Sequence, residues 1–147
     1  MILNNKIFVY GTLMDGLIQE VLPGIERYVK RKKKGKINAR LFDLGEYPAA
    51  RRTRLPNKVV YGLLYELDPK QVENVLDKMD DYEEYDPKKK NNSLYIRKLT
   101  PVIMESGGLD KAWVYWYNKP VNAGDEIKTG DYKKYLRQNK SKINGIK

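Results

Sequence analysis

The sequence predicts an α+β fold, in which a curled, mostly antiparallel sheet or a small β-barrel is accompanied by one main helix and short peripheral helices. Three observations predict it. Segments rich in strand-forming residues recur along the chain, with Gly, Pro or Asn clusters between several of them. A single long segment has apolar residues at helical spacing. The length, 147 residues, suits one domain with its own core.

Six segments are expected to be extended. They are residues 6–10, 26–32, 36–42, 59–67, 94–104 and 112–117. The basic residues between the second and third segments are predicted to form a hairpin that turns at Gly35. Because no repeat or linker divides the chain, we expect one domain over residues 1–138 and a polar, frayed tail over 139–147.

The main helix is predicted over residues 69–82, since Pro69 suits a first helical turn and apolar residues follow at the spacing of one buried stripe. The stripe consists of Val72, Val75, Leu76, Met79 and Tyr82. Shorter helices are predicted over residues 15–22 and 131–138.

Glu83 continues this apolar stripe, because it follows Met79 by four residues and Leu76 by seven. Three acidic neighbours are expected at the flanks of the stripe or outside it: Asp80, Asp81 and Glu84. Burial raises the pKa of a carboxyl group and makes it a proton acceptor suited to neutral pH. The alternative is a helix that ends at Tyr82, with Glu83 turned toward solvent.

The segment from Tyr10 to Leu13 ends an apolar run with a glycine. Gly11 lacks a Cβ and allows a ligand to approach the backbone closely. The amides of Thr12 and Leu13 would then be free to point at an anion or a carbonyl oxygen. An ordinary turn at the end of a strand is the alternative.

Two further segments offer binding groups. Pro48 biases Tyr47 toward an extended conformation, which would hold the loop of residues 43–50 in one shape. Tyr95 and Arg97 share one face of a predicted strand and would present a phenol and a guanidinium to a carboxylate ligand. The alternative for this face is ordinary exposure to solvent.

Taken in order, these segments resemble the gamma-glutamylcyclotransferase-like superfamily, which includes AIG2-like proteins. The matching segments are Tyr10-Gly11-Thr12-Leu13 for Y-G-[ST]-L, Gly45-Glu46-Tyr47-Pro48-Ala49 for G-x-[YF]-P-[AG], residues 60–67 for V-x-G-x-[LV]-[YW], residues 79–87 for L-D-x-[LYF]-E-G-Y, and Tyr95-Ile96-Arg97 for Y-x-R. The resemblance spans residues 6–117 and implies the same α+β architecture.

The register of the acidic motif has an alternative. Residues 76–80 also match L-D-x-[LYF] and would put Asp80 at the carboxylate position. The spacing to residues 85–87 and the apolar stripe favour Glu83. Glu84 stands where the family usually has glycine.

The resemblance implies a cyclotransferase that releases 5-oxoproline and a free amine from a γ-glutamyl amide or γ-glutamyl peptide. The substrate's α-amine would attack its own γ-carbonyl, with Glu83 as the proton shuttle. The backbone of Gly11, Thr12 and Leu13 would hold the glutamyl head, and Tyr10 would form a wall.

Tyr47, Pro48, Tyr95 and Arg97 complete the expected substrate-binding residues. The resemblance implies no metal and no organic cofactor. It leaves the leaving amine open: an amino acid, Cys-Gly, a lysine side chain or the amine of a specialised metabolite.

The composition restricts the chemistry further. The chain contains no cysteine and no histidine. This excludes disulfides, thiol nucleophiles, Cys/His metal sites and Ser-His-Asp arrangements. Acid–base catalysis in this chain therefore depends on carboxylates.

The net charge of +10 supports an alternative function. Residues 27–36 contain a dense run of lysine and arginine around Tyr28, typical of a surface that binds nucleic acid or another polyanion. A non-enzymatic binding module for nucleic acid or an acidic partner is therefore the second hypothesis. A solvated hairpin is the simpler explanation of the same residues.

No apolar stretch approaches the ~20 residues of a membrane span, and the first residues lack the pattern of a secretion signal. We therefore expect a cytoplasmic protein with no membrane partner.

Overall fold

The computed structural model describes residues 4–10, 24–45, 48–82, 88 and 93–138. Five strands form a closed barrel in the order β1 (Lys6–Val9), β5 (Val59–Leu67), β2 (Val29–Asn38), β6 (Tyr95–Met104) and β7 (Leu109–Tyr117). Neighbouring strands are antiparallel, except that β1 closes the barrel by pairing in parallel with β7. The predicted α+β class with a small, mostly antiparallel barrel is confirmed.

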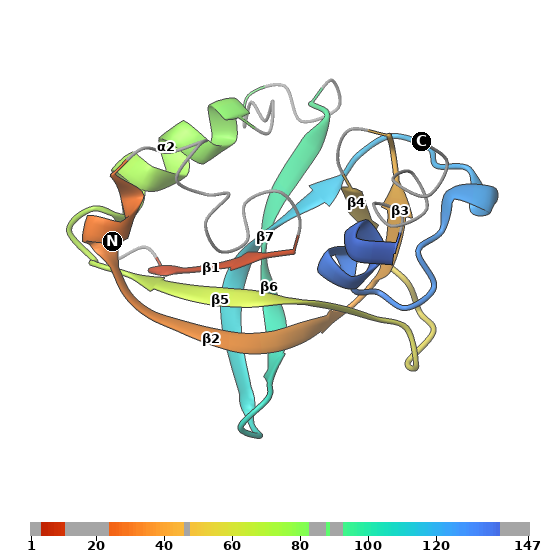
Figure 1. The fold of residues 1–147 in the computed structure, drawn as a ribbon. Helices are drawn as coiled ribbons and strands as arrows, with labels where there is room; N and C mark the ends of the chain where they lie inside the picture. The colour runs from red at the N-terminus through yellow and green to blue at the C-terminus, as the bar shows by residue number, and fades with distance from the viewer. Residues whose placement is uncertain (1–3, 11–23, 46–47, 83–87, 89–92, 139–147) are drawn as a thin grey trace.

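Smaller elements surround the barrel. Strands β3 (Arg40–Asp43) and β4 (Pro48–Arg51) form a separate two-stranded sheet, and α2 (Val72–Tyr82) is the main helix. Short 3₁₀ turns occur at η1 (Ile25–Tyr28) and η3 (Ala123–Asp125), and residues 132–138 are helical. Figure 1 shows α2 lying on one side of the barrel, with the sheet of β3 and β4 and the helical residues 132–138 on the other. None of the described helices is long and apolar enough to cross a membrane.

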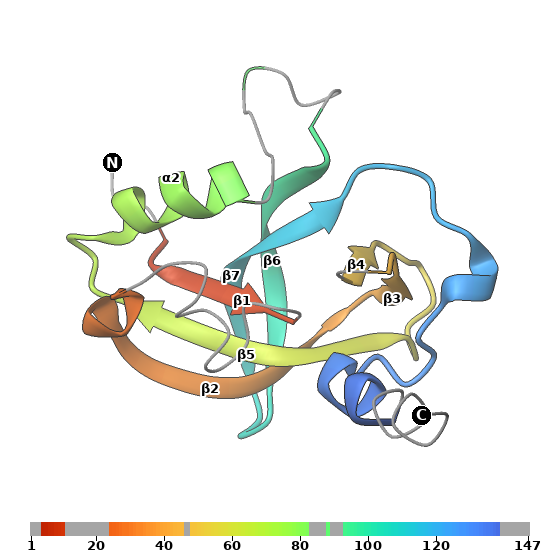
Figure 2. The same cartoon turned by 45° about the horizontal axis from the view of Figure 1, so that its top comes forward.

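The strands bury side chains on both faces. All five barrel strands contribute to an interior cluster that includes Phe8, Ile37, Leu64, Val102 and Val114. The opposite face of β1, β5 and β7 packs against α2 in a second cluster. Figure 2 shows the helix crossing over this face. Strand β5 buries the consecutive residues Leu64 and Tyr65 because their side chains point to opposite faces and enter different clusters.

The predicted hairpin turn at Gly35 is wrong. Strand β2 continues through this residue, and Gly35 pairs with Gly62 of β5 on one side and Met104 of β6 on the other. A Cβ at Gly35 would lie 2.8 Å from Cγ1 of Val102 and 3.1 Å from the carbonyl oxygen of Ile103. This glycine allows close packing inside the barrel and does not turn the chain.

Other boundaries differ from the sequence prediction. The helix begins at Val72, because Asp68 first closes a turn: its carboxylate accepts from the Lys70 amide and its carbonyl from the Gln71 amide. Residues 26–28, the start of the segment expected to be extended over 26–32, belong to the 3₁₀ turn η1. The predicted strand 36–42 is split between β2 and β3.

Strand β4 was not predicted at all, and it pairs with β3 from its first residue, Pro48, which is opposite Asp43. The helix expected over 131–138 is confirmed at residues 132–138. The helix expected over 15–22 lies outside the described residues.

Candidate functional site

The last turns of α2 carry a buried carboxylate that is held by two strands. Asp80 is 7% exposed. Arg97 of β6 donates from Nε to Oδ1 at 2.9 Å and from Nη2 to Oδ2 at 3.1 Å. The hydroxyl of Tyr115 in β7 donates to Oδ1 at 2.5 Å. The contact between Arg97 and Asp80 is bidentate, which is the strong geometry for an arginine–carboxylate pair.

The burial of Asp80 corrects the expectation that it lies at the flank of the stripe or outside it. The stripe itself is confirmed at Val72, Val75, Leu76 and Met79, which are at most 3% exposed. Asp80 follows Leu76 by one helical turn, so it also faces the barrel. Its charge is tolerated there because β6 and β7 supply Arg97 and Tyr115 as partners.

Arg97 was expected to offer its guanidinium to a substrate carboxylate. In the structure, two of its nitrogen atoms contact Asp80, and the guanidinium carbon lies 4.6 Å from the centre of the Trp113 ring. Arg97 therefore connects the end of α2 to the β6–β7 hairpin and is stacked on its neighbouring strand.

Tyr10 and Tyr95 both contact the backbone of β4. The Tyr10 hydroxyl donates to the carbonyl of Tyr115 at 2.7 Å and accepts from the amide of Ala50 at 3.3 Å. The Tyr95 hydroxyl donates to the carbonyl of Pro48 at 2.8 Å. Both rings are buried, so each phenol positions backbone at the end of the barrel.

Tyr115 links these contacts into one network. Its hydroxyl contacts Asp80, its carbonyl accepts from Tyr10, and it is opposite Arg97 in the β6–β7 register. The structure thus brings Tyr10, Arg97 and Asp80 into a chain of hydrogen bonds. Pro48 and Tyr95 form a separate contact that is joined to this chain through β4.

Five predicted site residues lie outside the described residues: Gly11, Thr12, Leu13, Tyr47 and Glu83. Their described neighbours, Tyr10, Pro48 and the end of α2, belong to the contacts given above.

Sequence reasoning missed Asp80 as a buried group and Tyr115 altogether. Asp80 follows Leu76 by four residues in the sequence, which is one helical turn. The predicted apolar stripe ran through Met79 to Glu83 and left Asp80 at its flank or outside it. Tyr115 gave no usable signal, since its place opposite Arg97 depends on the register of two strands.

Three comparisons with known proteins bear on this chain. A sequence model of the family described as "Gamma-glutamyl cyclotransferase, AIG2-like" matches residues 7–134. The protein named "Putative gamma-glutamylcyclotransferase MJ1514" from Methanocaldococcus jannaschii is 29% identical over 133 residues, which are 88% of this chain and 96% of that protein.

Solved structures share the fold. YkqA from Bacillus subtilis superposes with a TM-score of 0.71 at 23% identity, over 95% of this chain and 43% of YkqA. This chain therefore spans less than half of YkqA. An AIG2-like protein from Mus musculus superposes with a TM-score of 0.60 at 24% identity, over 87% of each chain. From the family match over residues 7–134, the chain belongs to the gamma-glutamyl cyclotransferase, AIG2-like family.

Proposed function

We propose that this protein is a γ-glutamyl cyclotransferase that converts a γ-glutamyl amide into 5-oxoproline and a free amine. The observation that carries the proposal is the family match over residues 7–134. The name of the Methanocaldococcus relative supports the same activity.

In the proposed reaction, the α-amino nitrogen of the substrate attacks its own γ-carbonyl carbon. A new C–N bond closes the five-membered ring, and the bond between that carbon and the leaving amine breaks. The α-ammonium nitrogen loses two protons on becoming the N–H of the ring, and the leaving nitrogen gains two and departs as an ammonium ion. The reaction consumes no cosubstrate, so the protein has to fold the substrate and transfer protons between these two nitrogen atoms.

Glu83 is the proposed proton shuttle, and the backbone of Gly11, Thr12 and Leu13 is the proposed cradle for the glutamyl head. These residues lie outside the described residues, so their roles rest on the family motifs. Tyr47, Pro48 and Tyr95 are the proposed walls of the substrate site. Tyr10 keeps its proposed role as a wall of the site, since it follows strand β1 directly and its hydroxyl accepts from the Ala50 amide.

The network around Asp80 supports the placement of the base. Arg97 and Tyr115 fix the last turns of α2 against β6 and β7, and Glu83 follows that helix directly. Arg97 is accordingly proposed as a positioning residue in addition to its expected contact with substrate. A fixed helix end would limit the movement of a base that has to reach the nitrogen atoms of both reactant and leaving group.

The test is release of 5-oxoproline from a panel of γ-glutamyl amides with different leaving amines: free amino acids, Cys-Gly, the lysine side chain and simple alkylamines. We expect turnover of at least one of these amides. The leaving amine of the amide that is converted fastest identifies the substrate class. If the folded protein releases no 5-oxoproline from any of them, the proposal is wrong.

A further inference from the structure

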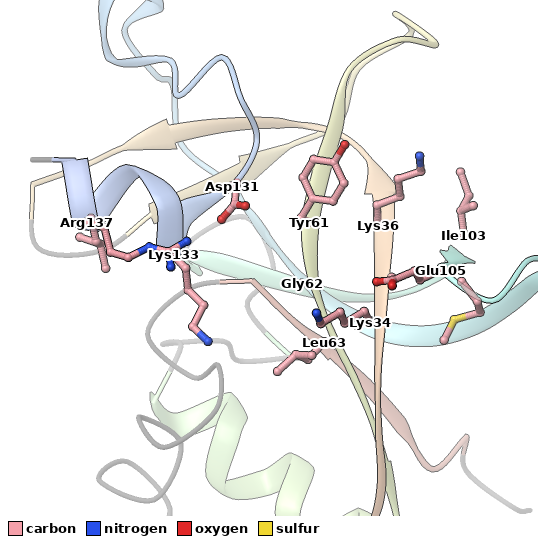
Figure 3. Close-up of a pocket in the computed structure, with 13 residues that line it drawn as sticks. Lys34, Lys36, Tyr61, Gly62, Leu63, Ile103, Glu105, Asp131, Lys133 and Arg137 are labelled. Carbon is pink, nitrogen blue, oxygen red and sulfur yellow. The ribbon is translucent and has the colours of Figure 1, made fainter.

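A groove of about 770 Å³ lies on the outer surface of the barrel, apart from the network around Asp80. Strands β2, β5 and β6 form one wall, and the helical residues 132–138 form the other. Figure 3 shows Tyr61 and Lys36 projecting side by side from neighbouring strands, with Lys133 and Arg137 on the helical segment. Its volume falls in the range of ordinary ligand sites.

The groove is basic. Lys34, Lys36, Lys133 and Arg137 line it together with two carboxylates, Glu105 and Asp131. Within the described part of the chain, no ion pair occupies Lys34, Lys36 or Arg137. Lys34 and Lys36 are two residues apart on the same strand face, which spaces them by roughly 7 Å.

Apolar side chains lie among these cations. Tyr61, Ile103 and Leu136 line the groove and are 45%, 39% and 40% exposed. Ile103, Lys36 and Tyr61 are aligned across β6, β2 and β5 by the strand register. The Lys36 ammonium lies 6.0 Å from the centre of the Tyr61 ring. These three strands thus present a partly exposed aromatic ring with a cation over it.

We propose that this groove binds single-stranded nucleic acid, with phosphates on Lys34, Lys36 and Arg137 and a base on the Tyr61 ring. Basic grooves that carry aromatic stacking platforms are the usual means of binding single strands without base reading. The site is independent of the cyclotransferase reaction. It also corrects the hypothesis of a basic hairpin, since the continuous strand β2 and the helical residues 132–138 form the surface together.

An acidic peptide fits this groove less well. A peptide that joins a sheet needs an unpaired strand edge. At Lys36, strand β2 is paired with β5 on one side and with β6 on the other, so its backbone offers no such edge. A nucleic acid strand needs only cations and a ring face, and both are present.

The experiment measures fluorescence anisotropy of a labelled oligothymidylate of about 12 nucleotides at about 50 and 200 mM salt. The wild-type protein is expected to bind, with a slope of log K against log salt near −2, because each of three neutralised phosphates contributes about −0.7. The triple variant Lys34→Ala, Lys36→Ala, Arg137→Ala should lose at least about tenfold in affinity at the lower salt and most of the slope.

A matched variant removes the same charge elsewhere: Lys70→Ala, Lys78→Ala, Lys98→Ala. These lysines are exposed and lie outside the groove. This variant should bind within about threefold of wild type if contacts in the groove, and not net charge, carry the affinity. Equal losses in the two triple variants would overturn the proposal, as would no binding by the wild-type protein.

The Tyr61 ring is tested by a conservative pair of variants. Tyr61→Ala should weaken oligonucleotide binding by about 5- to 150-fold, the range of a lost base stack, while Tyr61→Phe should retain it.

Polyglutamate is the competing probe. If it binds at least as tightly as the oligonucleotide and its binding is insensitive to Tyr61→Ala, the partner is an acidic peptide and the proposal fails. Release of 5-oxoproline by the groove variants is measured in parallel and should stay at wild-type levels, so that failure of this site is separable from failure of the cyclotransferase.

Discussion

Two carboxylates in this molecule, the buried Asp80 and the half-buried Glu126, are held in different ways. Within the part of the chain that the structure describes, Asp80 has one cationic partner, Arg97, and a hydrogen bond from Tyr115. Glu126 has two, since Arg40 donates from Nη2 to Oε1 at 2.8 Å and the Lys58 ammonium lies 3.2 Å from Oε2. The Arg97 side chain is 16% exposed, whereas that of Arg40 is 34% exposed.

The difference separates two kinds of ion pair. Glu126 fastens the loop after β7 to β3, where Phe42 forms a bridge with it and the Ile127 amide donates to the Leu41 carbonyl. Because Arg40 and Lys58 both contact Glu126, the carboxylate keeps a cationic partner when one of the two is lost. The Asp80 pair has no second cation among the described residues, and it fixes the helix end from which the proposed base follows. Loss of one partner there should affect both stability and position.

The largest effect expected from the comparison is on catalysis. Glu83→Gln should lower kcat by about 10²- to 10⁴-fold with binding of a γ-glutamyl ligand retained, because it removes the proton acceptor. Asp80→Asn should cost far less activity per folded molecule, and Glu126→Gln should cost none. Rates of 5-oxoproline release by the three variants, normalised to folded protein, provide the measurement. An inactive Asp80→Asn together with a normal Glu83→Gln would move the catalytic carboxylate to Asp80.

The next effect is on stability. Arg97→Met should lower the free energy of unfolding by about 3–5 kcal/mol, because it removes the cation that the described residues place on the buried Asp80 carboxylate. Arg40→Met should lower it much less, since Lys58 stays beside Glu126 and the Arg40 side chain is more exposed than that of Arg97. Urea unfolding with an unchanged m-value is the measurement. Equal losses in the two variants would contradict the distinction between the ion pairs.

Acid should weaken the Glu126 pair in a defined pH range. Hydrogen bonds from Arg40, followed by Lys58, lower the pKa of Glu126 from 4.5 to about 2. A lowered pKa in the folded state stabilises the protein above pH 4.5, and this contribution is lost as the pH falls toward about 2. The stability difference between wild type and Glu126→Gln should therefore shrink over that range. A constant difference from pH 6 to pH 2 would show that this carboxylate does not titrate as described.

The smallest effects separate two tyrosine hydroxyls. Tyr115→Phe should cost about 1.5–3 kcal/mol, because its hydroxyl donates to a carboxylate. The hydroxyl of Tyr65 is buried beneath α2 and has no hydrogen-bond partner among the described residues. Burial, with a smaller effect of Glu26, raises its pKa to about 12. Tyr65→Phe should thus be neutral or stabilise the protein by up to about 1 kcal/mol. Thermal unfolding of the two variants gives the comparison, and a large loss in Tyr65→Phe would reveal a partner for that hydroxyl.

Local patterns determined much of the fold. The stripe of Val72, Val75, Leu76 and Met79 predicted the helix and its buried face, because an α-helix repeats every 3.6 residues whatever it packs against. Alternation and turn residues located most strands, and the family motifs indicated a barrel. The motifs also named Glu83 and the segment from Tyr10 to Leu13, whose roles stay proposals.

Tertiary structure decided what local pattern left open. Gly35 was predicted to be a turn residue. The pairing of β2 with β5 and β6 shows instead that a side chain at this position would clash with Val102. Asp80 was expected at the flank of the stripe or outside it, because its partners Arg97 and Tyr115 lie 17 and 35 residues away in the sequence. Such contacts depend on strand register and on which helix face meets the sheet, and these are properties of the packed molecule, since no single segment of sequence contains both partners.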